Sequence, residues 1–112
     1  MMNVMLINGQ EAVIQFDPEI NLFRGEFIGL SGGADFYGPD IHTLQKEGEL
    51  SLKTYLQACA EQGIEPRKQF SGKLSLRLGT QTHERAAIVA AARGKSLNEW
   101  ILQTIEAAIA AA

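Results

Sequence analysis

Residues 71–112 read SGKLSLRLGTQTHERAAIVAAARGKSLNEWILQTIEAAIAAA and decide the fold that the sequence predicts. They begin with residues 73–78, which alternate strictly. Three leucines face one way, and Lys73, Ser75 and Arg77 face the other. Two helical segments follow, broken at Gly94. A strand with one apolar face cannot stand alone, because its backbone groups need a partner strand.

Pairing with a second copy of the chain would satisfy this strand. About forty residues also make too small a core to be stable without help. If two copies pair their strands antiparallel, the leucine faces cover the helices of both chains. The Lys-Ser-Arg faces then merge into one outward two-stranded ribbon, and such a ribbon fits the major groove of DNA. The sequence therefore predicts a homodimer.

This segment resembles the ribbon-helix-helix family of dimeric DNA-binding proteins. The resemblance rests on KLSLRL as the strand, on Gly94 as the break between the helices, and on SLNEWI as the start of the second helix. It implies that Lys73, Ser75 and Arg77 contact DNA bases, since Arg and Lys suit guanine and Ser can donate or accept. The alternative is an ordinary solvated strand face.

The start of the second predicted helix is a candidate phosphate site. Ser96 and Glu99 have the spacing of a capping box, and a helix N-terminus favours an anion. The resemblance implies that backbone amides at Ser96, Leu97 and Asn98 hold a DNA phosphate, to which Lys95 adds attraction. Plain helix capping is the alternative, and both roles are compatible.

Composition limits the classes of protein that fit. The chain has 112 residues, of which 46% are hydrophobic and 21% charged, which is typical of a soluble globular protein. Its apolar runs are far shorter than the roughly 20 residues of a membrane span, and the N-terminus has no pattern of a secretory signal. The single cysteine, Cys59, suits a reducing compartment. We therefore expect a cytoplasmic protein that does not associate with membranes.

Charge is divided unevenly along the chain. Residues 1–70 carry five Lys or Arg and ten Asp or Glu, a net charge of −5, whereas residues 71–112 carry five and three, a net charge of +2. The basic part suits phosphates, and the acidic part suits a basic partner. This division indicates two tasks.

The N-terminal part is predicted to form a small sheet and one helix. The helix covers residues 41–62, with Asp40 as its N-cap and Gly63 as its C-terminal stop. Gly48 lies on its apolar face, where a glycine favours close packing on the sheet. The predicted strands are residues 11–17, 22–30 and 34–37.

Residues 63–72, GIEPRKQFSG, read as a linker without apolar periodicity. The domain prediction is therefore residues 1–66, followed by residues 67–112. The predicted fold class is α+β: a small three-stranded sheet with one helix, then a ribbon-helix-helix dimerisation domain.

Nearly the whole chain resembles the HicB family of antitoxins from type II toxin–antitoxin systems. The similar segments are FDPE (16–19), FRGEFIGL (23–30), GADFYG (33–38), LSLKTYLQACAEQGIEP (50–66) and SGKLSLRL (71–78). The resemblance implies a partial, degenerate ribonuclease H-like domain that binds a small HicA-type ribonuclease toxin. It also implies a C-terminal domain that binds operator DNA, with neither catalysis nor a cofactor. The sequence leaves dimer against tetramer open.

Two other functions are weighed against this one. A stand-alone ribbon-helix-helix transcription regulator could use its N-terminal domain to sense a ligand or to oligomerise. A residual nuclease would need converging carboxylates, and we expect none to converge among Asp17, Glu19, Glu26 and Asp35. His42 and His83 lack metal-ligand spacing, and Cys59 falls on an apolar helix face, so no metal site is predicted.

Overall fold

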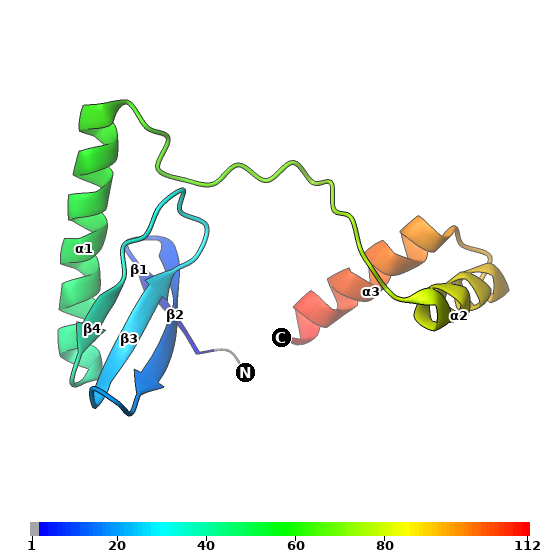
Figure 1. The fold of residues 1–112 in the computed structure, drawn as a ribbon, viewed down its shortest axis with the longest axis horizontal. Coiled ribbons are helices and arrows are strands. Elements are labelled where there is room, and N and C mark those ends of the chain that lie inside the picture. Colours follow the sequence, from blue (N-terminus) through cyan, green and yellow to red (C-terminus); the bar gives the residue numbers. More distant parts are fainter. Residues whose placement is uncertain (1–2) are drawn as a thin grey trace. The chain divides into compact units, whose positions relative to one another are not determined.

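A computed structural model describes residues 3–112, which divide into two compact units (Figure 1). The first unit runs to Ser71 and the second is Gly72–Ala112; each is described by itself. The architecture is α+β, with one four-stranded sheet and three helices in the described residues. In chain order the elements are β1 (Val4–Ile7), β2 (Gln10–Asp17), β3 (Leu22–Phe27), β4 (Phe36–Gly38), α1 (Ile41–Gln62), α2 (Thr80–Ala92) and α3 (Leu97–Ala111).

The sheet is an antiparallel meander in the order β1-β2-β3-β4. The prediction of three strands was wrong, because β1 adds a fourth strand at the edge of the sheet. β1 pairs with β2 from Val4 opposite Val13 to Ile7 opposite Gln10. Asn8 (φ 48°) and Gly9 (φ 83°) join the two strands, and two positive φ angles are what a tight type I′ hairpin turn requires.

The next two strands lie close to their predicted positions but differ in length. β3 ends at Phe27 rather than at residue 30, and Gly29 has a left-handed φ of 87°. Beyond this break, Leu30 forms an isolated antiparallel bridge with Arg67. β4 begins at Phe36, two residues later than predicted.

Helix α1 has both predicted ends. Asp40 accepts a hydrogen bond from the Thr43 amide at 2.7 Å, which confirms it as the N-cap. This bond lowers the pKa of the Asp40 carboxyl from its usual value. Gly63 adopts the left-handed conformation at the C-terminal end, with a φ of 66°. The helix therefore has the length that its sequence signals indicate.

The core lies between α1 and one face of the sheet (Figure 1). At its centre the Phe36 ring fills the space left by two glycines. A Cβ atom on Gly25 would lie 2.1 Å from the ring, and one on Gly48 would lie 2.9 Å from it. The predicted close packing at Gly48 is therefore confirmed. The buried hydrophobic members of the core are Ile7, Ala12, Phe27, Ala34, Phe36, Leu44 and Leu52.

Gly25→Ala tests this packing. The added methyl group would displace the Phe36 ring, which is buried and packs on Phe27 at a centroid distance of 5.0 Å. Overpacking of this kind costs about 1–3 kcal/mol, so we expect a lower thermal unfolding midpoint by calorimetry. Gly33→Ala is the control, because a Cβ there meets nothing within 4 Å. Equal midpoints for the two variants would contradict the packing argument.

Part of the predicted linker is fixed to the first unit. The Ser31 amide donates to the Pro66 carbonyl at 3.0 Å, and the Lys68 amide donates to the Gly29 carbonyl at 2.8 Å. The Tyr55 hydroxyl donates to the Pro66 carbonyl at 2.9 Å. Residues 66–68 are therefore held by the loop after β3 and by helix α1.

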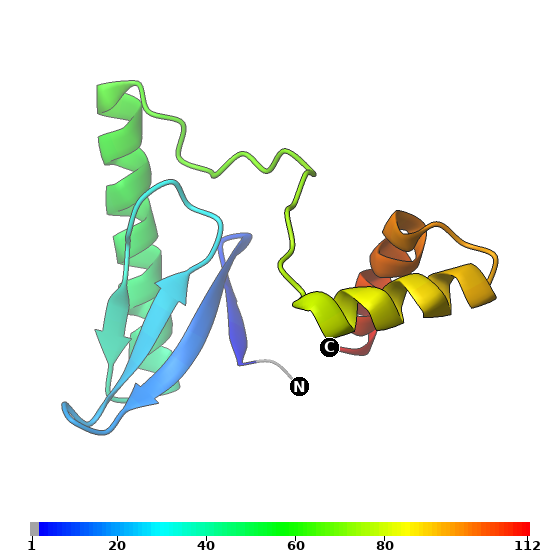
Figure 2. The ribbon, with the colours of Figure 1, turned by 45° about the vertical axis from the view of Figure 1, so that its right-hand side comes forward.

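The second unit contains α2 and α3 with a tight turn between them (Figure 2). Gly94 has a φ of 68°; its amide bonds to the Ala91 carbonyl, and the Lys95 amide bonds to the Ala90 carbonyl, each at 3.0 Å. These two bonds form a Schellman motif, so the predicted helix break at Gly94 is confirmed. Residues 71–79 contain no strand in this single chain, and pairing with a second copy stays a prediction.

Candidate nucleic-acid interface and surrounding surfaces

The three predicted base-contacting residues precede α2. Lys73, Ser75 and Arg77 are all exposed. The leucines between them are also exposed, with Leu74 at 77% and Leu76 at 48%. Leucine side chains with such large exposed fractions, gathered in one segment, are not part of a packed core. The segment thus has the alternating side chains of an amphipathic strand, and its apolar side chains are open to solvent.

The predicted phosphate-contacting residues lie together at the start of α3. Ser96 is the N-cap, and its hydroxyl accepts from the Glu99 amide at 3.1 Å. The same hydroxyl donates to the Glu99 carboxylate at 3.1 Å, whereas in a standard capping box that carboxylate reaches the Ser96 amide. Leu97 and Asn98 occupy the first turn, where helix amides have no carbonyl four residues before them.

Lys95 precedes α3, and its ammonium group lies against this helix. Its Nζ atom hydrogen-bonds to Oε1 of Gln103, so the side chain lies along the first turns of α3. A groove in this unit is lined by Arg77, Leu97 and Asn98, among other residues. The structure thus brings the last predicted base-contacting residue and the start of α3 to one surface.

Helices α2 and α3 leave much apolar surface exposed. Only Ala86 and Ala90 of α2 are buried, and no residue of α3 is. Leu102 is 54% exposed and Ile109 is 68% exposed. A second groove opens between the helices. Its lining is mainly apolar and includes Leu76, Leu78, Ala86, Val89, Trp100 and Ile101.

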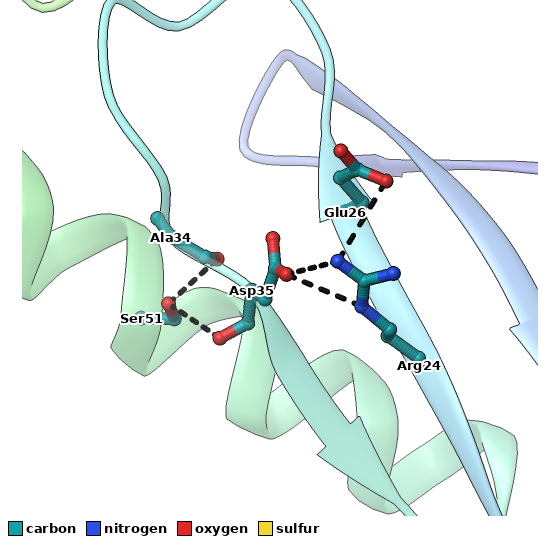
Figure 3. Close-up of polar contacts among 5 residues, drawn as sticks. All are labelled: Arg24, Glu26, Ala34, Asp35 and Ser51. Carbon is teal, nitrogen blue, oxygen red and sulfur yellow. Dashed lines mark hydrogen bonds and ion pairs between the residues drawn. The ribbon is translucent and has the colours of Figure 1, made fainter. Parts of the chain in front are cut away.

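The candidate nuclease carboxylates do not converge as a set. Figure 3 shows the Arg24 guanidinium between Asp35 and Glu26: it hydrogen-bonds to Asp35 Oδ2 and lies 3.9 Å from the Glu26 carboxylate. The hydrogen bond and charge of Asp35 raise the pKa of Arg24. Asp17 instead accepts from the Glu19 amide at 3.0 Å in the turn after β2.

Asp35 is positioned from the helix side as well. The Ser51 hydroxyl of α1 donates to the Ala34 carbonyl at 2.9 Å and reaches the Asp35 carbonyl at 3.5 Å (Figure 3). Arg24 could not be predicted from the sequence as the partner of two carboxylates, because this contact depends on the pairing of β3 with β4. Within residues 3–112, no group of three or more His, Cys, Asp or Glu side chains is placed to hold a metal ion.

The HicB family model matches residues 55–105. The matched segment begins in the second half of α1, crosses residues 63–79 and ends within α3. The match supports membership of the HicB family, a family of antitoxins, and so indicates a protein related to toxin–antitoxin systems. No curated protein and no solved structure gave a match. Among the described helices, none is both long and apolar enough to cross a membrane.

Proposed function

We propose that this chain is the antitoxin of a HicA/HicB-type toxin–antitoxin pair and represses its own operon. The observation that carries the proposal is the HicB match over residues 55–105, combined with a C-terminal unit whose apolar side chains the single chain leaves exposed. Residues 3–71 would bind and neutralise a small basic ribonuclease toxin. The unit Gly72–Ala112 would bind the operator as a ribbon-helix-helix dimer.

The exposed leucines support the choice of a second copy as the partner of this unit. Leu74 and Leu76 alternate with Lys73, Ser75 and Arg77, so antiparallel pairing of two such segments would put all leucines on one face. That face would cover the apolar groove between α2 and α3.

The polar side of the same pair supports DNA as the ligand. Two copies would present Lys73, Ser75 and Arg77 twice on one ribbon, a form that enters the major groove. The start of α3 would add amides of Leu97 and Asn98 for a phosphate. Bases would then be contacted by side chains of the ribbon, and phosphates by helix ends.

Toxin binding is assigned to residues 3–71 because of their charge. A net charge of −5 over residues 1–70 would attract a basic protein and repel DNA. We expect a fragment of residues 1–71 to bind the toxin encoded beside this chain, and to protect cells when overexpressed. The fragment ends at residue 71 because residues 66–68 are bonded to the loop after β3.

Titration of the toxin with the folded fragment, at several salt concentrations, tests this assignment. The association rate should fall as salt rises, because exposed charges are screened. Fragment Gly72–Ala112 is the control and should not bind the toxin. A folded fragment 1–71 that binds no neighbouring toxin would favour a stand-alone transcription regulator.

A further inference from the structure

One face of the sheet in the first unit is left open by α1. The helix packs on the face formed by Ile7, Ala12 and Phe36, and it lies along that side in both views (Figures 1 and 2). Side chains alternate along a strand, so the neighbouring positions point to the opposite face. α1 is the one helix of the described residues 3–71, and it does not cover that opposite face.

The register places apolar side chains in rows across this open face. Leu6 lies opposite Glu11, and the Ile28 amide bonds to the Glu11 carbonyl on the other side. Val4 lies opposite Val13 in the next row. Leu6 is 63% exposed and Ile28 is 50% exposed, so both ends of the first row are available to a partner.

Carboxylates surround these apolar side chains. Glu26 lies opposite Val13, Glu11 lies between Leu6 and Ile28, and Asp17 ends β2. Arg24 is the one basic residue in the four strands, and Asp35 and Glu26 already hold its guanidinium. Since Arg24 alone offsets the charge of several carboxylates, the open face keeps an excess of negative charge.

We propose that this open sheet face, defined by Val4, Leu6, Glu11, Val13, Glu26 and Ile28, is the surface on which a small basic protein docks. The inference rests on the proposed function and names the toxin-binding surface within it. Apolar side chains would be desolvated at the centre, and the carboxylates would steer and orient the cationic partner.

The negative charge of the open face argues against a second copy of the chain and against nucleic acid as its partner. A second copy of the chain would bring the same carboxylates against each other, and like charges across an interface cost several kcal/mol. Nucleic acid would be repelled by the same carboxylates. The outer face of α1 is a poorer candidate for a basic partner, since it carries Lys46 and Lys53 beside its acidic residues.

Two pairs of matched variants of the full-length chain test the surface. Glu11→Lys changes the charge on the open face, and Glu47→Lys makes the same change on α1; both carboxylates are exposed. Leu6→Ser removes an apolar side chain from the open face, and Leu50→Ser does so on α1, where Leu50 is 59% exposed. Circular dichroism and the thermal midpoint check that all four variants fold.

The probe is the small basic HicA-type protein that the proposed function requires in the neighbouring gene, carrying a substitution that removes its ribonuclease activity. We expect Glu11→Lys and Leu6→Ser each to raise the dissociation constant about tenfold. Glu11→Lys should also reduce the dependence of the association rate on salt. Each α1 variant should stay within about twofold of the unsubstituted chain.

If the two members of each pair change the dissociation constant equally, the assignment of the docking surface is wrong, but the proposed function is not contradicted. A change in the oligomeric state of the free chain in Glu11→Lys or Leu6→Ser would assign the face to a second copy, and this result too would overturn the inference. If the unsubstituted chain does not bind the probe, the proposed function itself fails, and the docking surface fails with it.

Discussion

Leu76→Pro is expected to convert the protein from a dimer to a monomer. Proline removes a backbone donor from the proposed ribbon, and the substitution also removes an apolar side chain from the proposed dimer core. Loss of a buried leucine alone costs about 2–5 kcal/mol. Two-fold symmetry doubles the loss, so the dimer dissociation constant should rise about a thousandfold or more.

Sedimentation measures this change, and operator binding should be lost with the dimer. Gln69→Pro is the matched control, because Gln69 is exposed and precedes the proposed ribbon; it should leave the dimer intact. The decisive version uses the fragment Gly72–Ala112, in which the first unit cannot hold the chains together. A Leu76→Pro fragment that stays dimeric with unchanged helicity would show that the paired ribbon is wrong.

Arg77→Ala and Lys95→Ala should weaken DNA binding in different ways. Arg77 is proposed to contact bases, so its loss should cost roughly 1–3 kcal/mol at the operator and relax the preference at one position in each half-site. Lys95 is proposed to contact phosphate, so its loss should weaken all sequences about equally. The slope of the logarithm of the binding constant against the logarithm of the salt concentration should then become shallower by about one for each contact removed.

Titrations on operator and random duplex at several salt concentrations separate the two roles. The half-sites should be related by two-fold symmetry, because the proposed ribbon is symmetric. Toxin binding should survive both substitutions, because they lie outside residues 3–71. Equal losses for Arg77→Ala on both duplexes would show that the ribbon only holds phosphates.

Local signals predicted the helices well. Asp40, Gly63 and Gly94 act through bonds within a few residues of themselves, so the chain near each of them contains the whole signal. The same reasoning missed β1, although Asn8-Gly9 between two apolar runs is a strong hairpin signal.

Contacts between distant segments were not predictable in the same way. Leu30 pairs with Arg67, and Arg24 of β3 reaches Asp35, which directly precedes the neighbouring strand β4; neither contact has a local sequence pattern. The length of β3 was overestimated because the apolar residues after Phe27 continue the strand pattern while Gly29 turns the backbone. The proposed ribbon at residues 73–78 would form between two chains, so its pairing is not a contact that one chain can show.

The pairing of Leu30 with Arg67 should also limit cleavage of the chain by proteases that cut after arginine. A protease must take an extended backbone into its active site, so the bond after Arg67 becomes available only when this bridge opens. The bridge opens and closes within one chain, so the rate at which the bond after Arg67 is cut should be independent of protein concentration. The bond after Arg77 would be protected by the second copy, and its lifetime would rise with concentration. At low protein concentration the bond after Arg77 would thus become accessible to proteases, whereas the protection of the bond after Arg67 would not change.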